Sequence, residues 1–495
     1  MLFHVRIGLV VHGIAMLLLS AVAAIGQPAP AWHSIVTKNF TLIGDTAESD
    51  LRSEAARIET FRKAFGRLYP GTKLGNSKPT TIVLFNDAAS FNAMLPKRPD
   101  GSADDGVTGY FLAGDRQNYI ALALDQRHHR SPVVHEFIHL VLDANFGTAS
   151  LPPWLNEGLA EYFDATETAN DGTLAIGGEE RGHLQLLRRV GLIPVTEIAA
   201  TSADALRAMS AQRRQQFYAE SWLLVRQLVA DNRLKIESLS TNLEILKTGG
   251  DKLTAAFGED ATAIQTALTR SLAERSLRFA TTSVAASADP LPATTALPMG
   301  RASAVLGDLL FEIGEADRAE TFLSEALAAD KNEPMANAVY GKLLVAKNKL
   351  PEARACLKTA IDAGSTDHWV YFDYAFAISR EFISGGAIGD ISDSASSEML
   401  RALRRSIELE PGLVESYHLA ALVELARDRD LDEATTFARR AVEINPDDAD
   451  LKLLLAQILL RRDDAKAARE LAGQVAALPD ARGKAEADEI IKTAD

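Results

Sequence analysis

Two histidines separated by three residues give the strongest chemical signal in this sequence of 495 residues. From position 135 the chain reads His-Glu-Phe-Ile-His. On an α-helix, positions i and i+4 lie on one face, so His135 and His139 can direct a ring nitrogen at a single metal ion. Ser131 as N-cap and the apolar run 133–142 predict a buried helix here. Buried imidazoles and a carboxylate need partners, and a metal ion supplies them.

A second helical motif follows and offers the third ligand. Residues 152–163 read Pro-Pro-Trp-Leu-Asn-Glu-Gly-Leu-Ala-Glu-Tyr-Phe. The proline pair suits a helix start, and Glu157 and Glu161, again i and i+4, place two carboxylates on one face. A catalytic zinc takes three protein ligands and leaves one position open, and two histidines with one glutamate are an established set. His135, His139 and Glu157 therefore predict a Zn²⁺ site.

Together the two motifs resemble the zinc-binding helices of the gluzincin metallopeptidases, in the peptidase MA-like branch. The resemblance is carried by the His-Glu-x-x-His stretch and by the later Trp-Leu-Asn-Glu-Gly-x-x-Glu-Tyr, and it extends more loosely over residues 32–280. It implies a zinc metallopeptidase in which Glu157 is the third ligand. It also implies that Glu161, one turn further on, orients the ligand His135 by a hydrogen bond.

Glu136 and Tyr218 are the candidate catalytic residues of such a site. On the helix, Glu136 points about 100° away from His135, toward the open coordination position, which predicts a general base acting on a zinc-activated water. Tyr218 lies near the position from which related gluzincins donate a hydrogen bond to the oxyanion. It also begins an apolar stripe that continues at helical spacing to Val229, so a place in the core is the alternative.

One departure from the family concerns the residues before His135. No Gly-x-Met-Glu-Asn motif, with which aminopeptidases hold a free amino group, precedes that histidine. The resemblance therefore favours an endopeptidase over an aminopeptidase. The segment 106–111 takes the corresponding place, and as an edge strand it would pair with an extended protein or peptide substrate. Its residues would equally suit an ordinary strand.

Other residues with metal-binding chemistry give no comparable pattern. The single cysteine, Cys356, excludes an intramolecular disulfide and a cysteine-based zinc site. Four further histidines lack ligand spacing and are expected to be structural or exposed: His33, His183, His368 and His418.

The elements that must position the two motifs change in character along the chain. Short β-branched segments bounded by Asp, Asn or Gly predict strands, and after position 130 helices dominate. The expected strands are 39–44, 80–85 and a hairpin of 107–112 with 118–124, with a helix over 47–68. The expected fold over residues 27–280 is an α+β metallopeptidase domain, with a small mixed sheet and a helical zinc-binding core.

Beyond a stretch at 281–300 that is rich in Ala, Ser, Thr and Pro, and is expected to be a linker, the sequence repeats itself. Positions 34 residues apart carry the same small residues: Gly307 and Gly341, Ala319 and Ala353, Ala326 and Ala360. This period resembles the tetratricopeptide repeat (TPR), a helix-turn-helix unit that stacks into an all-α solenoid. About five units are expected over 301–495, the last a cap, with an insertion at 379–397 interrupting the third.

The N-terminus predicts export. A short basic region precedes an apolar run from Ile7 to Ile25, followed by small residues, so residues 1–26 are expected to be a cleaved signal peptide. An uncleaved membrane anchor is the alternative, because the run is about long enough to span a bilayer. The protein is expected in the periplasm or outside the cell. Its net charge of −15 argues against nucleic acid as a partner.

Two functions fit these patterns. The first is an exported zinc endopeptidase that cleaves a protein or peptide, with the repeats recruiting the substrate or a partner protein. The second is a repeat scaffold that binds partner proteins, in which the metallopeptidase domain is inactive or vestigial. The intact Glu136 argues for the first, because an inactive domain has no need of a general base.

Overall fold

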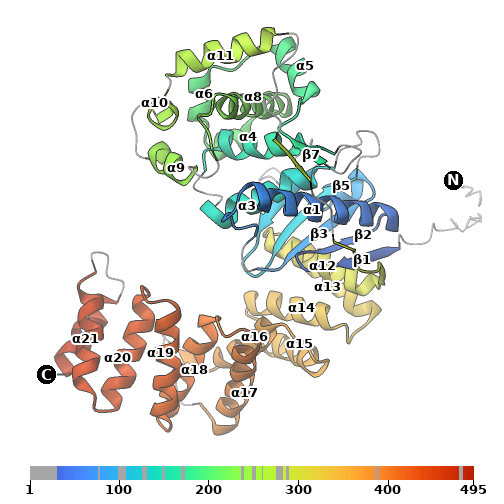
Figure 1. Ribbon diagram of the computed structural model, residues 1–495. Helices are drawn as coiled ribbons and strands as arrows, with labels where there is room; N and C mark the ends of the chain where they lie inside the picture. The colour runs from blue at the N-terminus through green and yellow to red at the C-terminus, as the bar shows by residue number, and fades with distance from the viewer. Residues whose placement is uncertain are drawn as a thin grey trace, which may run out of the picture.

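The computed structural model describes residues 31–494 except for short gaps at 76–77, 98–106, 125–130, 148–150, 169–172, 236–238, 248–251, 259, 275–281, 286–288, 385–386, 389–390 and 479–482. The chain forms a β-sheet with helices on both faces, a helical layer beside it and a long array of helix pairs (Figure 1). The predicted signal peptide lies outside the described residues. Within the described part of the chain, no helix is long and apolar enough to cross a membrane.

Six strands of the described chain form the central sheet: β1 (Trp32–Val36), β2 (Thr41–Gly44), β3 (Thr80–Phe85), β4 (Gly109–Ala113), β5 (Asn118–Ala123) and β9 (Thr295–Leu297). Their order is β4-β5-β3-β2-β1-β9. The three central strands β5, β3 and β2 are parallel, and the outer strands are antiparallel to their neighbours. β3 is buried at every residue, as expected where helices cover both faces. The predicted small mixed sheet is confirmed.

The local predictions for the sheet match the structure closely. β3 has the predicted bounds, the predicted hairpin is formed by β4 and β5, and α1 (Glu48–Leu68) begins one residue after the expected start. β2 begins later than predicted, because the amide of Thr37 donates to Phe40 O and closes a turn just before the strand.

One face of the sheet packs against α1 and α3 (Val133–Phe146) in a single apolar core. Ser131 is not the N-cap predicted for α3, because Pro132 takes that place; its hydroxyl still accepts a hydrogen bond from Val133 N, at 3.3 Å. The short α2 (Ala88–Asn92) follows β3.

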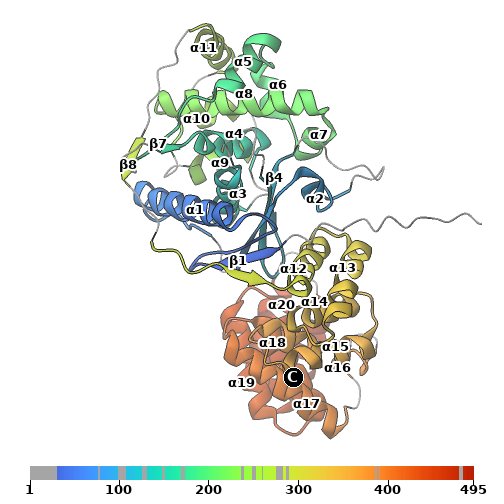
Figure 2. The same ribbon diagram turned by 90° about the vertical axis from the view of Figure 1, so that its right-hand side faces the viewer.

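A helical layer continues this core, and Figure 2 shows α8 lying across it above α4. Its helices are α4 (Pro153–Asp164), α5 (Arg181–Val190), α6 (Val195–Ala200), α7 (Ala203–Ala208), α8 (Ala211–Ala230), α9 (Leu239–Lys247), α10 (Lys252–Phe257) and α11 (Ala261–Ala273). α4 begins at the second residue of the proline pair, as the sequence predicts.

The stretch 281–300, expected to be a linker, contributes two strands. β8 (Thr282–Ala285) pairs with β7 (Thr173–Ile176), which also pairs with β6 (Glu167–Thr168). β9 pairs with β1 and extends the central sheet, as the yellow strand beside β1 in Figure 2 shows. Edge strands of three or four residues carry no readable hydrophobic period, which is why the sequence pattern did not predict them.

Five helix pairs follow in the described residues. They are α12 (Met299–Glu312) with α13 (Ala316–Ala329), α14 (Pro334–Ala346) with α15 (Leu350–Asp362), α16 (His368–Ser379) with α17 (Asp393–Leu409), α18 (Val414–Arg427) with α19 (Leu431–Ile444), and α20 (Ala449–Arg461) with α21 (Ala465–Ala476). A further helix, α22 (Lys484–Thr493), packs on the last pair. The cap is therefore this single helix and not the fifth unit.

The 34-residue period has a packing cause. A Cβ placed on Gly307 would lie 2.7 Å from Leu323 Cγ, and one on Gly341 would lie 2.5 Å from Leu357 Cγ. Each glycine therefore lets the two helices of its pair approach closely. The predicted insertion in the third unit contains the short strands β10 (Ile383–Ser384) and β11 (Ala387–Ile388).

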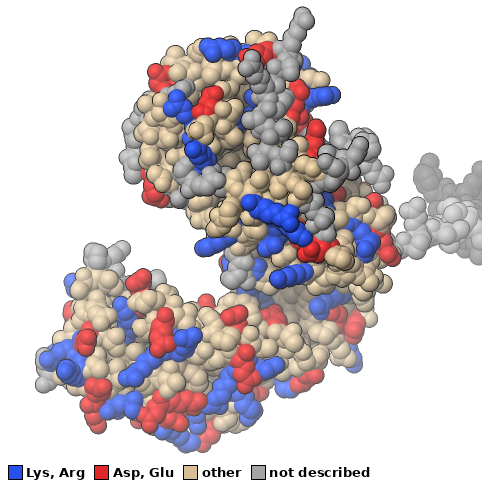
Figure 3. Space-filling model, viewed as in Figure 1, with Lys and Arg blue, Asp and Glu red and all other residues tan. Residues whose placement is uncertain are grey.

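The first repeats share a core with the sheet. Apolar residues of α12, α13 and α14 pack against the second face of the sheet, including Val305, Leu309, Leu310, Leu323 and Leu343 against Val83, Phe85, Tyr119 and Ala121. The distal repeats stand away from the sheet, and on the face seen in Figure 3 they carry charges of both signs, closely interspersed. The array is thus anchored at one end and solvated at the other.

Candidate metal centre and active site

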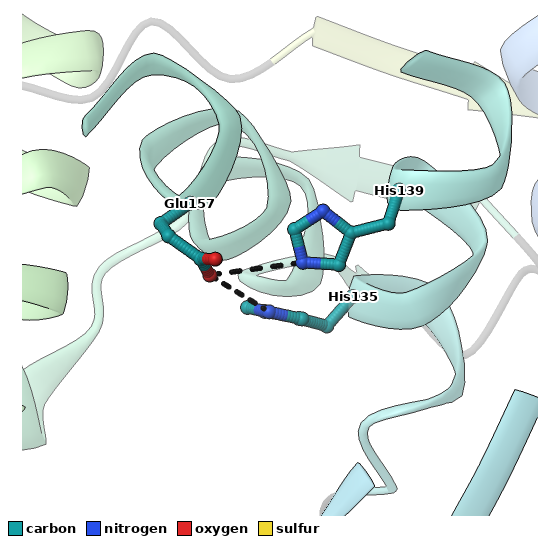
Figure 4. A group of neighbouring side chains, drawn as sticks. All are labelled: His135, His139 and Glu157. Carbon is teal, nitrogen blue, oxygen red and sulfur yellow. Dashed lines mark ion pairs between the residues drawn. The ribbon is translucent and has the colours of Figure 1, made fainter. Parts of the chain in front are cut away.

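Helices α3 and α4 bring the three predicted zinc ligands together. His135 and His139 lie one turn apart on α3, and both rings face the carboxylate of Glu157 on α4 (Figure 4). Glu157 Oε2 lies 3.6 Å from His135 Nε2 and 3.7 Å from His139 Nε2. One ligand atom from each residue lies within 4.8 Å of the others, and no other such cluster of three occurs among the described residues.

The approach of α4 to α8 sets the position of Glu157. The next residue, Gly158, faces α8 so closely that an added Cβ would lie 2.5 Å from Ser221 O. Trp154 and Leu155, on the preceding turn, are fully buried. The glycine in the Asn-Glu-Gly stretch therefore has a structural purpose, which is to bring the glutamate's helix against the helix that carries Tyr218.

Side chains around the cluster leave the Nε2 atom of each histidine directed at Glu157. His139 Nδ1 lies 3.2 Å from Asn156 Oδ1, a hydrogen bond that fixes the proton on Nδ1 and leaves Nε2 as the metal-binding atom. His135 Nδ1 lies 3.8 Å from Glu161 Oε1. This distance is that of an ion pair and not the hydrogen bond implied for Glu161.

Glu161 makes its shorter contact with a residue that the sequence pattern did not single out. His183 Nε2, on α5, lies 3.0 Å from Glu161 Oε2, and its ring packs against Trp222 at 5.7 Å. Of the two expectations for His183, structural or exposed, the first fits, since the residue is half-buried, and it also lines the same cavity. It comes from a separate helix, so no i to i+4 spacing relates it to the two motifs.

The carboxylates around the histidines make the cluster attractive to a cation. Burial lowers the pKa of His135, but contact with Glu157 and the charges of Glu161 and Glu136 outweigh burial and raise it to about 10. Burial prevails at His139 and lowers its pKa. At Glu161 burial is outweighed by His183, and the pKa falls to about 2. Glu161 is therefore ionised at every physiological pH.

Glu136 lies in a different environment from His135, His139 and Glu157. It faces the edge strand β4, where a Cβ on Gly109 would lie 3.0 Å from Glu136 Oε1. Burial raises the pKa of the Glu136 carboxyl to about 8, against the opposing charge of His135. A carboxyl group with a pKa near neutrality exchanges protons readily, which is the property of a general acid or base.

Tyr218 shares a cavity of about 760 Å³ with the cluster. The cavity is lined by β4 on one side, by α3 and α4, and by α5 and α8 opposite, where Arg214 precedes Tyr218 by one helical turn. Burial, with the charge of Glu157, raises the pKa of the Tyr218 phenol, so the hydroxyl stays protonated and can donate a hydrogen bond. Tyr218, which is half-buried, also packs against the core, as one of the two sequence interpretations expects, and its catalytic role stays a prediction.

The donor set fits zinc. Two ligands of a tetrahedral zinc, each bonded at 2.0–2.1 Å, lie about 3.3 Å apart, close to the separations between Glu157 and the two imidazoles. Two nitrogen donors and one oxygen donor suit zinc better than the all-oxygen sets of calcium or magnesium. His135, His139 and Glu157 are the residues that would hold the ion.

No protein-family model matches the sequence, and no curated protein matches it. Similarity to solved structures covers only part of the chain. YrrB, described as a TPR protein with an unusual peptide-binding site, is 21% identical over 38% of this chain and 90% of its own, with a TM-score of 0.33. A thermophilic TPR protein of Thermus thermophilus is 16% identical over 39% of this chain and 99% of its own (TM-score 0.29), and Pseudomonas aeruginosa PilF is 17% identical over 40% and 88% (TM-score 0.31).

These comparisons agree with the helical repeats and extend no further. Their identities and TM-scores are too low to carry an argument about activity. The helix pairs of the array, with their 34-residue period, stand on the chain's own structure.

Proposed function

We propose that this protein is a zinc metallopeptidase. The observation that carries the proposal is the convergence of His135 and His139 with Glu157 on one point, next to a buried Glu136 and inside a cavity large enough for a peptide. Neither helix alone offers more than two of the three candidate ligands. Their meeting is the arrangement expected of two histidines, one glutamate and a catalytic carboxyl.

When bound, Zn²⁺ would act as a Lewis acid that polarises the scissile carbonyl and lowers the pKa of the attacking water, which therefore loses its proton more easily. The other parts of the reaction are assigned to side chains of the protein. Glu136 takes a proton at its carboxylate and returns it to the leaving amine. Tyr218 donates its phenolic hydrogen to the developing oxyanion. Glu161 and Asn156 orient the imidazoles of His135 and His139, respectively, through their Nδ1 atoms, which do not face Glu157.

The substrate is proposed to be an extended stretch of a protein or peptide chain. β4 is an edge strand of the sheet, so one of its sides pairs with no other described strand and offers a place for strand addition, and three of its residues line the cavity: Gly109, Tyr110 and Phe111. Cleavage within a chain is therefore favoured over removal of terminal residues. The protein is proposed to act outside the cytoplasm, on the basis of its N-terminal segment.

The proposal is tested by measuring bound metal and peptide hydrolysis on the full chain. Elemental analysis after zinc loading and dialysis should find one zinc per chain, and mass spectrometry of peptide libraries should find internal cleavage. Glu136→Gln should keep the zinc and lose about 10²-fold or more of the rate. Glu424→Gln, at a buried carboxyl of α18 that pairs with Arg427, is the matched control and should change neither. A chain that binds no zinc after loading refutes the proposal.

A second candidate function is protein binding by the repeats without proteolysis. Half-exposed aromatic residues follow one another along α16, with Trp369 5.6 Å from Phe372, and Phe372 stacked on Phe376 at 5.9 Å. Stacked helix pairs use such faces to hold peptides. The peptide-binding site in the name of YrrB belongs to that protein, and a comparable activity is proposed here only as this alternative.

A peptide-display selection against the full Glu136→Gln chain separates the two functions. A binding scaffold should select peptides whose affinity falls when Phe376 is changed to alanine and stays when zinc is removed. Recovery of no peptide, together with cleavage by the unaltered chain, would leave the peptidase as the only function.

A further inference from the structure

The tip of the β4–β5 hairpin contacts α16, the first helix of the third helix pair. Arg116 forms a bidentate ion pair with Asp373 of α16, with Nη2 2.7 Å from Oδ1. The same guanidinium lies 4.2 Å from the ring centroid of Trp369. The side chain of Asp373 is 5% exposed and that of Arg116 is 22% exposed, so the pair is largely shielded from solvent. Such a pair is strongly directional, because the planar fork fits the carboxylate in one geometry.

Helix α12 of the first pair holds the same turn and the start of β5, and α14 of the second pair contacts α12 there. The amide of Asp115 donates to Glu312 Oε2 of α12, at 3.0 Å. The hydroxyl of Tyr119 donates to Asp308 Oδ2, at 2.7 Å, and Lys342 of α14 approaches the other oxygen of Asp308 at 3.2 Å. α12 and α16 therefore contact the hairpin directly, and α14 contacts the α12 carboxylate that holds it. Figure 1 shows α12, α14 and α16 following one another from the sheet into the array.

β4 itself lies between the repeats and the cavity. Tyr110 and Leu112 point to the core that the sheet shares with α12 to α14. Phe111 points the other way, packs against the core of the candidate site and lines its cavity. A Cβ placed on Gly109, at the start of the strand, would lie 3.0 Å from Glu136 Oε1. A shift of the hairpin tip would therefore move the strand that forms one wall of the cavity.

We propose that Asp373 and Trp369 are positioning residues of the cleavage site, which act through Arg116 by holding β4 in place. The proposal rests on the proposed peptidase function. It assigns the repeats a role within their own chain: they order the strand on which an extended substrate would lie. A repeat array that only recruited substrate would have no need to clamp this strand.

Hydrogen exchange on the full, zinc-loaded chain tests whether the contacts of Arg116 hold β4 in place. The amides of residues 109–113 should exchange about tenfold faster in Arg116→Gln and in Asp373→Asn, because the edge strand opens more often. The double variant should be no faster than either single one, since both remove the same contact. Arg404→Gln breaks a bidentate pair of the same kind with Glu433, away from the hairpin, and should leave β4 unchanged. Unchanged exchange in Arg116→Gln would overturn the proposal.

Steady-state kinetics on an extended peptide distinguish positioning from a merely structural contact. At a temperature where all variants are folded, KM should rise about three- to tenfold and kcat should stay within about twofold, because the strand binds substrate and takes no part in bond cleavage. Faster exchange with unchanged KM would overturn the positioning role. If the unaltered chain cleaves nothing, the peptidase proposal fails, and the exchange rates alone decide whether the repeats hold β4.

Discussion

At the scale of single residues, the candidate site depends on contacts behind its ligands. Glu161 stands between two imidazoles, with His135 at 3.8 Å on one oxygen and His183 at 3.0 Å on the other. The contact with His183 fixes the orientation of the Glu161 carboxylate. The longer contact lets the negative charge of Glu161 act on the imidazole of His135. His183 therefore supports Glu161, which in turn contacts the proposed metal ligand His135.

Replacement of His183 by leucine should lower zinc affinity about 10–100-fold, because Glu161 would lose the contact that orients it. Glutamine at the same position keeps a hydrogen-bond donor and should recover most of the affinity. Competition with a chelator measures both. His418→Leu, at a half-buried histidine of α18, is the control and should bind zinc as the unaltered chain does. Equal affinities for the leucine variant and the unaltered chain would contradict this account.

Glu220 of α8 should make the stability of the protein depend on pH. Its side chain is fully buried, Oε2 accepts a hydrogen bond from Ile193 N, and Oε1 has no hydrogen-bond partner among the described residues. Burial raises the pKa of this carboxyl from 4.5 to about 8. Between these values the folded chain holds a proton that the unfolded chain has released, so stability falls as pH rises from about 4.5 to about 8 and then levels off.

Glu220→Gln should remove that contribution. The variant should gain stability relative to the unaltered chain as pH rises across the window, by a few kcal/mol at most. Urea unfolding at pH 5, 6.5 and 8 measures the difference. A difference that is constant over the three pH values would show that Glu220 does not titrate in this range.

The sequence predicted that His135, His139 and Glu157 come together, but it did not predict the contacts that support them. His135 and His139 are related by helix geometry, which is local, and Glu157 was indicated by the resemblance of its motif to a known family. The contacts of His183 and of Arg116 join residues far apart in the chain, 22 and 257 positions from their partners. A spacing rule carries no information about such pairs.

At the scale of elements, the site depends on how closely α4 approaches α8. Gly158 allows this approach, and both helices contribute to the cavity. The sequence predicted α4 from its proline pair and its carboxylates. It did not predict β8 and β9, whose strands are short and lie at edges. Long periodic elements could be predicted, and short ones formed by distant pairing could not.

Gly158→Ala should destabilise the fold by about 1–3 kcal/mol and weaken zinc binding, because the new methyl group meets the backbone at Ser221 O and pushes α4 away. Thermal unfolding and chelator competition measure the two effects. Gly473→Ala in α21 is the matched control: no atom lies within 4 Å of its added Cβ, and it should stabilise by about 0.5–1 kcal/mol. A Gly158→Ala chain as stable as the unaltered one would show that α4 and α8 can separate without cost.

At the scale of the whole molecule, the boundary between domain and repeats runs through a shared core. The expected separation at 281–300 does not describe this arrangement, since β9 extends the sheet and α12 to α14 cover its second face. Beyond α16 the described helices of the array pack chiefly on one another and on the cap. The chain is thus better described as a sheet with three attached helix pairs, followed by a solenoid extension.

This arrangement predicts different outcomes for two truncations. A chain ending at residue 297 uncovers the sheet face that Leu309, Leu310 and Leu323 bury. Each buried leucine contributes about 1.5–3 kcal/mol, so their loss is comparable with the whole stability of a domain, about 5–15 kcal/mol. This chain should aggregate, or unfold at a much lower temperature than the full chain.

A chain ending at residue 410 keeps the covered face and the pair of Arg116 with Asp373. It should bind zinc with an affinity within about twofold of that of the full chain, since solenoid units contact only their neighbours. Calorimetry and zinc titration compare them, and a soluble, zinc-binding chain of the shorter kind would show that the repeats are a separate module after all.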